Sequence, residues 1–161
     1  MPGELDLGLG FDLQLLIRDA AKVLLAFLLA LPIGWERGKG RDSVGFRTLP
    51  IVSMAACGFA IIVELEASMS AEARARVLQG VVTGIGFIGG GAIVKSGRDV
   101  RGLVTAASIW NAGAIGAAVG FGRGNIAVAL CLLNLLSLWI LGFLGPNGKE
   151  GRGGDNAGRN G

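Results

Sequence analysis

The chain has 161 residues, of which only 17% are charged and 52% are hydrophobic, with a mean hydropathy of +0.60 and a formal net charge of +3. A soluble globular domain carries about 25% charged residues, whereas here the charges gather in short islands between long uncharged tracts. This pattern argues against a soluble domain and is typical of an integral membrane protein. The chain also lacks histidine, the commonest metal ligand and proton shuttle.

Five tracts with few charges come close to the length of about 20 residues that a transmembrane helix needs. In chain order they lie at about residues 20–35, 49–63, 77–94, 103–121 and 126–144. The sequence therefore predicts an all-α membrane protein, a bundle of about five transmembrane helices. Cys57 and Cys131 both lie inside these tracts, which predicts two buried thiols and no disulfide framework.

The segments on either side of these tracts differ from them in composition. Residues 1–17 begin with MPGELDLGLGFD, which is acidic where a signal peptide is basic, so we expect an N-terminal segment on the periplasmic side. Residues 145–161 contain seven glycines and almost nothing apolar, which predicts a disordered tail in the cytoplasm. Residues 18–144 between them form the predicted membrane domain.

Lysine and arginine are distributed unevenly between the two predicted sides of the membrane. Ten of the 15 lie in the first loop, the third loop and the C-terminal tail, and five lie in the remaining segments. Loops rich in lysine and arginine face the cytoplasm. The sequence therefore predicts a multi-pass protein of a bacterial inner membrane, with its N-terminus outside and its C-terminus inside.

The stretch GIGFIGGG at residues 84–91 fits the G-x-G-x-x-G pattern of a dinucleotide-binding loop. Such a loop follows a strand, opens a soluble helix and has an acidic residue about 20 residues further on. Here the glycines lie inside an apolar tract, and Asp99 follows them too soon, in a loop. We therefore reject nucleotide binding.

Two interpretations of these glycines stay open. Gly80 and Gly84 form one GxxxG pair, and Gly86 and Gly90 form another on a different face, which favours a helix packed closely between two neighbours. Alternatively the backbone unwinds there, which a membrane tolerates only where the segment is buried or lines a cavity. The fourth tract repeats the small-residue pattern, with Gly116 and Gly120 four residues apart.

Polar side chains at membrane depth complete a candidate intramembrane polar or glycine site on the third and fourth tracts. The simplest role of such polar residues is interhelical hydrogen bonding, worth about 0.6 kcal/mol each. The fifth tract contributes Asn134 and Ser137, for which the same hydrogen-bonding role is expected. The candidate site consists of Gln79, Thr83, Gly84, Gly86, Gly89, Gly90, Gly91, Thr105, Ser108 and Asn111.

Four motifs occur in the order GWERG at 34–38, VGFRT at 44–48, LQGVVTGIGFIGGGAI at 78–93 and VRGLVTAASIWNAGAIGAAVGFG at 100–122. In this combination the chain resembles the N-terminal membrane domain of the MgtC/SapB family, from about residue 15 to residue 140. The differences are mild, such as Val104 where many members have threonine. Many members continue into a small ACT-like domain, where this chain has the glycine-rich tail.

The resemblance implies an inner-membrane protein associated with magnesium homeostasis and with adaptation to low magnesium. It also implies a regulator that acts on membrane partners, such as ATP synthase or a sensor or transport protein. A magnesium or other ion transporter or channel is the first alternative, and a structural homo-oligomer is the second. We expect a lipid bilayer around the protein, no nucleic-acid partner and, because no nucleophile lies beside a base, no enzymatic activity.

The chemistry of the predicted spans gives magnesium transport little support. Magnesium prefers carboxylate and carbonyl oxygens in octahedral geometry, yet Glu36 and Glu64 lie only at span ends, and no acidic residue lies in a span core. The metal site is therefore unknown, and we expect no cofactor.

A candidate functional rim lies where three predicted spans end at the cytoplasmic side. If the connections bring these ends together, the carboxylate of Glu36 is placed to pair with Arg47 or Arg101 as a clamp between helices. Alternatively the rim binds an anion or a partner protein. The rim consists of Glu36, Arg37, Arg47, Thr48 and Arg101.

Overall fold

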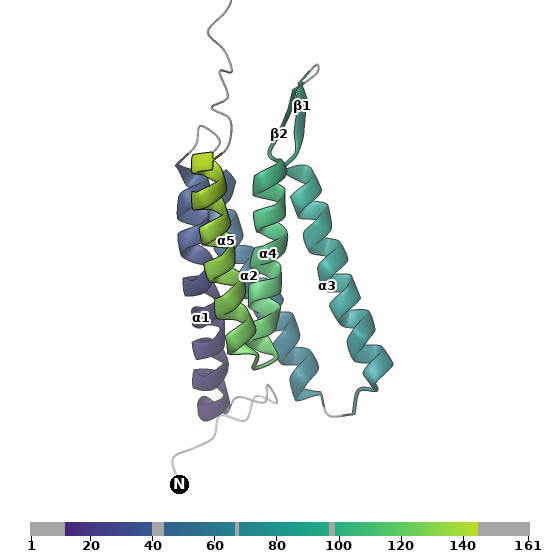
Figure 1. Ribbon diagram of the computed structural model, residues 1–161. Coiled ribbons are helices and arrows are strands. Elements are labelled where there is room, and N and C mark those ends of the chain that lie inside the picture. The colour runs from purple at the N-terminus through teal and green to yellow at the C-terminus, as the bar shows by residue number, and fades with distance from the viewer. Residues whose placement is uncertain (1–11, 40–43, 67, 97–98, 145–161) are drawn as a thin grey trace, which may run out of the picture.

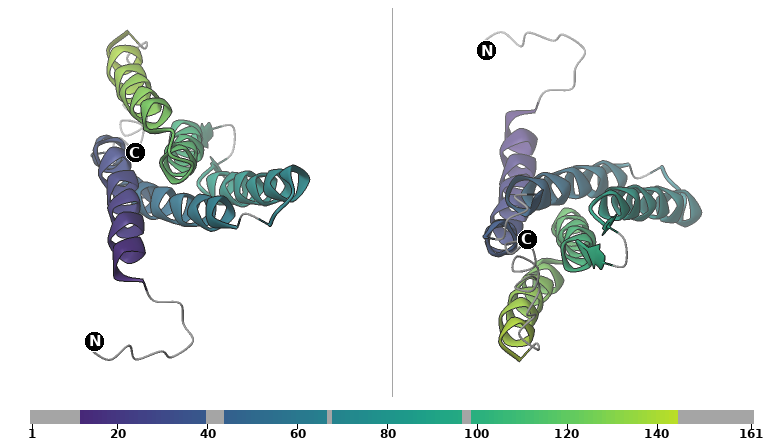
Figure 2. Two further views of the ribbon diagram at one scale, coloured as in Figure 1. Left: turned by 90° about the horizontal axis from the view of Figure 1, so that it is seen from below. Right: turned by 90° about the horizontal axis from the view of Figure 1, so that it is seen from above.

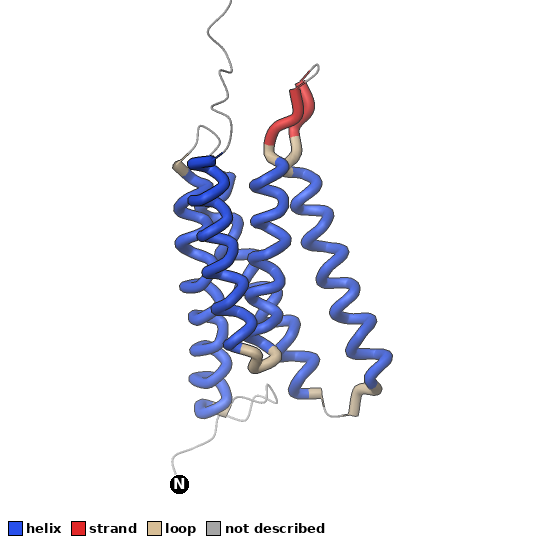
Figure 3. The backbone as a smooth tube through the Cα atoms, viewed as in Figure 1, coloured by secondary structure: helices blue, strands red, loops and turns tan. Residues whose placement is uncertain are grey.

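The computed structural model describes residues 12–39, 44–66, 68–96 and 99–144. The part described contains five helices and one hairpin, and this confirms the predicted all-α bundle (Figures 1 and 3). The elements are α1 (Leu13–Gly38), α2 (Val44–Leu65), α3 (Ala71–Gly91), β1 (Val94–Ser96), β2 (Asp99–Arg101), α4 (Leu103–Gly120) and α5 (Gly124–Leu144).

Successive helices run in opposite directions, so the two ends of the bundle collect different segments (Figure 1). The last turn of α1, the start of α2, the hairpin, the start of α4 and the last turn of α5 lie at one end. This end contains the predicted rim. The predicted tail at 145–161 lies outside the described residues.

Three of the helices within the described residues are long and apolar enough to cross a membrane: α2, α4 and α5. The N-terminal halves of the other two carry charge, with Arg18 and Lys22 in α1 and Arg74 and Arg76 in α3. The three apolar helices identify the chain as a membrane protein. That all five helices cross the membrane stays a prediction.

Helix α1 begins earlier than the apolar tract indicates. The side chain of Asp12 accepts hydrogen bonds from the backbone N–H groups of Gln14 and Leu15, at 2.8 and 3.3 Å, and this caps the helix N-terminus. Residues 13–17, which the composition assigns to an N-terminal segment, are thus helical. Apolar length alone could not reveal this boundary, because the cap lies outside the apolar tract.

The hairpin between α3 and α4 corrects the predicted end of the third span at residue 94. Helix α3 ends at Gly91, and Val94 then pairs with Arg101 in an antiparallel register. Gly102 follows β2 with a φ of 87° and starts α4. The chain leaves the bundle in this hairpin and returns to it (Figure 3).

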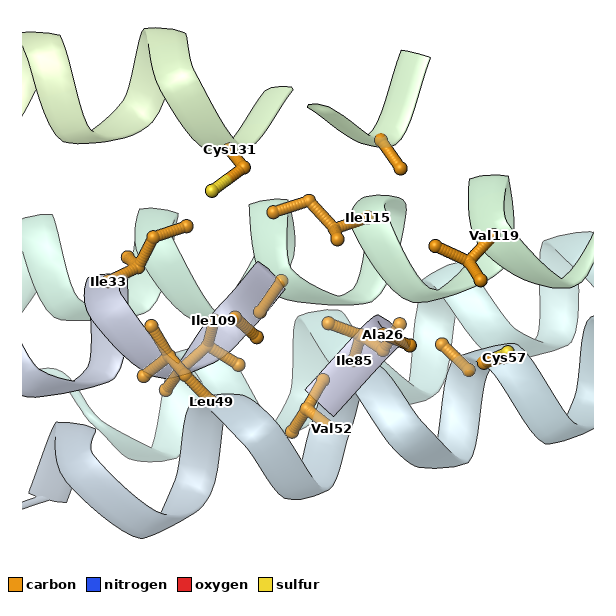
Figure 4. Packing of buried hydrophobic residues seen from close by; sticks show 14 of the residues in the cluster. Ala26, Ile33, Leu49, Val52, Cys57, Ile85, Ile109, Ile115, Val119 and Cys131 are labelled. Atoms are coloured by element: carbon orange, nitrogen blue, oxygen red, sulfur yellow. The ribbon is translucent and has the colours of Figure 1, made fainter. Parts of the chain in front are cut away.

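The core lies where α1, α2 and α4 meet, and α2 has its most extensive contacts with α4 and α1. Ile33 from α1, Leu49 from α2, and Ile109 and Ile115 from α4 are fully buried there (Figure 4). Helices α3 and α5 lie at the periphery when the bundle is seen along its length (Figure 2). Both cysteines are buried and free, as predicted.

Three side-chain donors tie α1 to its neighbours. The hydroxyl of Ser53 on α2 donates to the carbonyl oxygen of Ala26 at 2.9 Å, and the thiol of Cys131 on α5 donates to that of Leu29 at 3.1 Å. Lys22 Nζ donates to the carbonyl oxygen of Gly120, the last residue of α4, at 3.2 Å. A cation at a helix C-terminus is favourable, which explains a lysine next to an apolar tract.

Glycine-rich helix contacts are present, but they lie mainly on α4. A Cβ atom built on Gly116 would overlap the backbone oxygen of Ser53, and one on Gly120 would lie 2.6 Å from the backbone oxygen of Cys57. Helices α2 and α4 therefore approach each other through their backbones, which is how helices associate in lipid.

Candidate functional site between α4 and α5

A groove of about 550 Å³ lies between α4 and α5. Helix α5 is the least buried of the three helices that are long and apolar enough to cross a membrane, since only 11% of its apolar stretch is buried. The residues lining the groove are Arg37 from α1, Val104, Ala107, Ser108 and Asn111 from α4, and Leu130, Leu133, Asn134, Ser137, Leu138, Leu141 and Gly142 from α5.

The polar lining comes from two helices that each place polar residues three positions apart. Ser108 and Asn111 lie on one face of α4, and Asn134 and Ser137 lie on one face of α5, because residues at i and i+3 are neighbours on a helix surface. Asn111 Nδ2 donates to the carbonyl oxygen of Leu130 at 3.4 Å, which joins the two helices beneath the groove.

The other polar residues of the groove differ in exposure and in hydrogen bonding. Ser137 donates to the carbonyl oxygen of Leu133, one turn earlier on α5, at 2.7 Å. Ser108 is only 2% exposed, while Asn134 is half-buried. The groove therefore presents amide and hydroxyl groups on the lipid-facing surface of the bundle. Lipid chains provide no hydrogen bonds to such groups.

Arg37 is positioned at the groove by the close crossing of α1 and α2. A Cβ atom on Gly45 would lie 2.5 Å from the Cβ of Arg37, so only glycine at that position lets the two backbones come this near. Gly34 meets the same part of α2, with a built Cβ 3.1 Å from the backbone oxygen of Gly45. The motifs GWERG on α1 and VGFRT on α2 thus lie where these two helices cross. This close contact positions Arg37 at the groove.

The Nε atom of Arg37 is buried and has no hydrogen-bond partner. A buried donor without an acceptor costs about 1–3 kcal/mol, and more when it is charged. Guanidinium groups bind planar oxyanions through two parallel hydrogen bonds. The arrangement is therefore suited to an acceptor that approaches through the groove.

The predicted clamp at the rim is not what the described residues show. Glu36, in the last turn of α1, accepts from Nζ of Lys39, the residue that follows this helix, at 2.7 Å, rather than from Arg47 or Arg101. The reason is local, because Lys39 lies on the same helix face and reaches the carboxylate without any interhelical closure. An exposed pair of this kind contributes about 0–1 kcal/mol.

The other rim residues lie apart from the groove. Arg47 lines a second pocket of about 520 Å³, together with Trp35, Gly38, Lys39 and Phe46. The rings of Trp35 and Phe46 meet edge to face there, with centroids 5.6 Å apart.

Thr48 is half-buried on α2, and Arg101 ends β2 with an exposed side chain. The rim is therefore several sites at one end of the bundle rather than one cluster.

The candidate intramembrane site is likewise divided. Ser108 and Asn111 line the groove, Thr105 is half-buried on α4 outside the lining, and Gln79 and Thr83 are exposed on α3. Thr83 donates to the carbonyl oxygen of Gln79 at 2.8 Å, a bond within its own helix.

The glycine run forms an unbroken part of α3, so local unwinding is not found and the nucleotide loop is absent there. The prediction that the glycines pack α3 closely between two neighbouring helices of this chain is also wrong. Only Gly89 in the run approaches a neighbour, with a built Cβ 3.3 Å from the backbone oxygen of Ala106. A Cβ would meet nothing within 4 Å at the other glycines of this helix, Gly80, Gly84, Gly86, Gly90 and Gly91.

Asn134 and Ser137 are groove residues that the sequence places among the polar residues at membrane depth but that are not part of the predicted candidate site. The feature of the sequence that indicates them is a pair of polar residues three positions apart on the most apolar of the described helices. Among the described residues, no group of three or more His, Cys, Asp or Glu side chains is placed to hold a metal ion.

The apolar helices, their glycine-mediated contacts and the polar groove on the outer side define a multi-pass α-helical membrane protein. The profile of the MgtC family matches residues 23–146. The chain belongs to the MgtC family.

Relatives of the chain include proteins from several bacteria. It is 36% identical to Protein SrpB of Synechococcus elongatus over 129 residues, which is 73% of this chain and 71% of that protein. It is 36% identical to Protein MgtC of Salmonella typhimurium over 119 residues, 74% of this chain and 50% of that protein. Protein MgtC of Brucella abortus is 40% identical over 107 residues, 66% of this chain and 44% of that protein.

The chain thus spans about half the length of the MgtC proteins it matches. No solved structure matches it at a significant level.

Proposed function

We propose that this chain is a regulator in the inner membrane that acts in magnesium homeostasis by binding a transmembrane helix of a partner protein. Its surface for the partner is the groove between α4 and α5. The membrane character is a property of the fold and the family. The regulatory role and the link to low magnesium are the proposal, and the name of its relatives is one support for it.

The polar lining of the groove is the observation that carries this proposal. Asn134 and Ser137 lie on a helix that is largely uncovered, and the hydrogen bond that Ser137 donates stays within its own helix. Polar groups that face hydrocarbon are costly unless they find partners. A neighbouring transmembrane helix supplies such partners through interhelical hydrogen bonds and close van der Waals contact. No enzymatic step is part of this role.

The positive charge at the groove favours binding of a partner over conduction of magnesium. Arg37 is one of the lining residues, and a guanidinium is charged at any physiological pH. A fixed cation repels a divalent cation over the few ångströms of a groove. The oxygens in the lining would have to outweigh this repulsion without a carboxylate among them.

The proposal predicts that filling the groove abolishes function in the cell. In a strain that lacks the gene, Asn134→Leu should fail to restore growth in low magnesium, because leucine removes the amide and occupies part of the groove. The control is Asn125→Leu on the exposed start of the same helix, outside the groove lining. Membrane levels of both variants are measured by immunoblotting.

Two results would contradict the proposal. One is full complementation by Asn134→Leu at normal protein level. The other is saturable magnesium uptake by the purified chain in proteoliposomes that Asn134→Leu blocks, which would show that the groove is a transport path.

In the proposed orientation, the end of the bundle that contains Arg37 faces the cytoplasm. Lys39 and Lys95 lie at this end, and Arg123 lies at the opposite end. We expect reporter fusions after Lys39 and Lys95 to be active only as cytoplasmic reporters, and a fusion after Arg123 only as a periplasmic one. The reverse pattern would invert the topology and place Arg37 outside.

A further inference from the structure

We propose that the helix bound in the groove carries a carboxylate, and that this carboxylate pairs with Arg37. This inference rests on the proposed function and adds to it the chemistry of the partner. The partner helix would carry an aspartate or glutamate near the membrane surface, at the end of the bundle where α1 and α5 terminate (Figure 1).

The first support is the state of Arg37 itself. Its Nε is buried without an acceptor, and the neighbouring carboxylate of Glu36 is already engaged by Lys39 at 2.7 Å. The side chain belongs to the last turn of α1 and lines the groove together with α4 and α5. A carboxylate entering the groove would satisfy the guanidinium through charge-assisted, two-pronged hydrogen bonds.

The second support is the direction in which the polar lining continues from Arg37. Helix α5 runs towards this end of the bundle, so Ser137 and Asn134 lie one and two turns further from it than Leu141 does. Asn111 lies across the groove and bonds to the carbonyl oxygen of Leu130. The occupant must therefore be anionic near Arg37 and offer hydrogen-bonding groups deeper in the membrane.

A helix with an acidic residue near its end meets both requirements, and a phospholipid meets only one. A lipid phosphate would suit Arg37, but its acyl chains would then lie against Ser137, Asn134 and Asn111. Asn111 and Ser137 already donate to carbonyl oxygens of α5, but the amide of Asn134 and the acceptor oxygens of all three side chains would face hydrocarbon, which is costly. Polar and small side chains of a helix can bond to them instead.

The test uses two synthetic transmembrane peptides and the full chain in nanodiscs of phosphatidylcholine. The peptides share one leucine–alanine sequence with a single serine at mid-length, and they differ in one position near the end, which is glutamate in one and glutamine in its twin. Each carries a dansyl group that accepts energy from the tryptophans of the chain. Trp139 on α5 is 77% exposed and provides a donor on the groove helix.

We expect the glutamate peptide to bind about tenfold more tightly than its twin, because hydrogen bonds to charged groups are the stronger ones. Arg37→Gln should remove this difference, and Arg37→Lys should keep only part of it, because lysine lacks the planar fork. Lys95→Gln is the charge-matched control on the exposed hairpin at the same end, and it should keep the full difference. Thermal unfolding of each variant verifies that it is folded.

The outcomes separate this inference from the proposed function. Equal binding of the two peptides, weakened by Asn134→Leu, would refute the carboxylate and leave helix binding intact. If neither peptide binds, or if Asn134→Leu has no effect on their binding, helix binding in the groove is refuted as well.

A lipid occupant has its own signature. If phosphatidylglycerol from the cell membrane co-purifies in detergent with the wild type but not with Arg37→Gln, and the two peptides show no difference in binding, the carboxylate is replaced by a lipid phosphate. Binding of a second copy through Arg37, seen as a change in mass of the nanodisc complex, would equally overturn the proposal.

Discussion

Gly116→Ala is expected to cause the largest loss of stability of any glycine-to-alanine change among the residues that the structure describes. A Cβ atom at this position would overlap the backbone oxygen of Ser53, and a backbone atom cannot rotate away as a side chain can. Overpacking of this kind costs about 1–3 kcal/mol, and it acts where α2 and α4 make the most extensive contact in the bundle. The thermal midpoint of the purified protein in detergent measures the effect.

Gly84→Ala is the matched control for this change. A Cβ atom at Gly84 would meet nothing within 4 Å, and alanine is favoured over glycine in a helix interior by about 1 kcal/mol. Its midpoint should equal or exceed that of the wild type. If Gly116→Ala proved as stable as Gly84→Ala, the close backbone contact between α2 and α4 would be disproved.

Gly102→Ala is expected to have the second-largest effect, at the junction of the hairpin with α4. Gly102 has a φ of 87°, and its added Cβ would overlap the carbonyl oxygen of Ala92. The left-handed conformation alone costs a non-glycine residue about 1–2 kcal/mol. We expect a lower thermal midpoint together with faster tryptic cleavage after Lys95 and Arg101, since a frayed hairpin is a preferred site of cleavage.

Gly91→Ala serves as the comparison, because it lies at the other side of the same hairpin with no atom within 4 Å of its built Cβ. It should leave both the midpoint and the cleavage rate unchanged. Equal cleavage of the two variants would show that the hairpin does not depend on the backbone conformation of Gly102.

The sequence predicts the helices well because apolar length is a property of each segment alone. It does not predict the hairpin, because a short apolar stretch such as the one that ends at Val94 fits a strand as well as a helix. The cap at Asp12 lies outside the apolar tract, so hydropathy places the start of α1 too late. Each difference arises where local backbone hydrogen bonding, rather than hydropathy, decides the boundary.

The candidate site is less predictable because it depends on which helices become neighbours. Ser108, Asn111 and Arg37 are recognisable as unusual residues in the sequence, but the sequence does not show that they share one groove with Asn134. Glycines in the run at 84–91 outnumber those of α4, yet the closest contacts belong to α4. A glycine motif identifies where close contact is permitted, and the neighbouring helix determines where it occurs.

The central position of α4 has a consequence for the order of assembly during synthesis. Helices α1 and α2 follow each other directly and contact extensively, so this pair can form as soon as both have entered the membrane. The main partner of α2 on its other side is α4, which is synthesised only after the whole of α3 and the hairpin. A nascent chain that ends before α4 therefore exposes the side of α2 that later contacts Gly116 and Gly120. The arrival of one late helix closes the core and anchors α3.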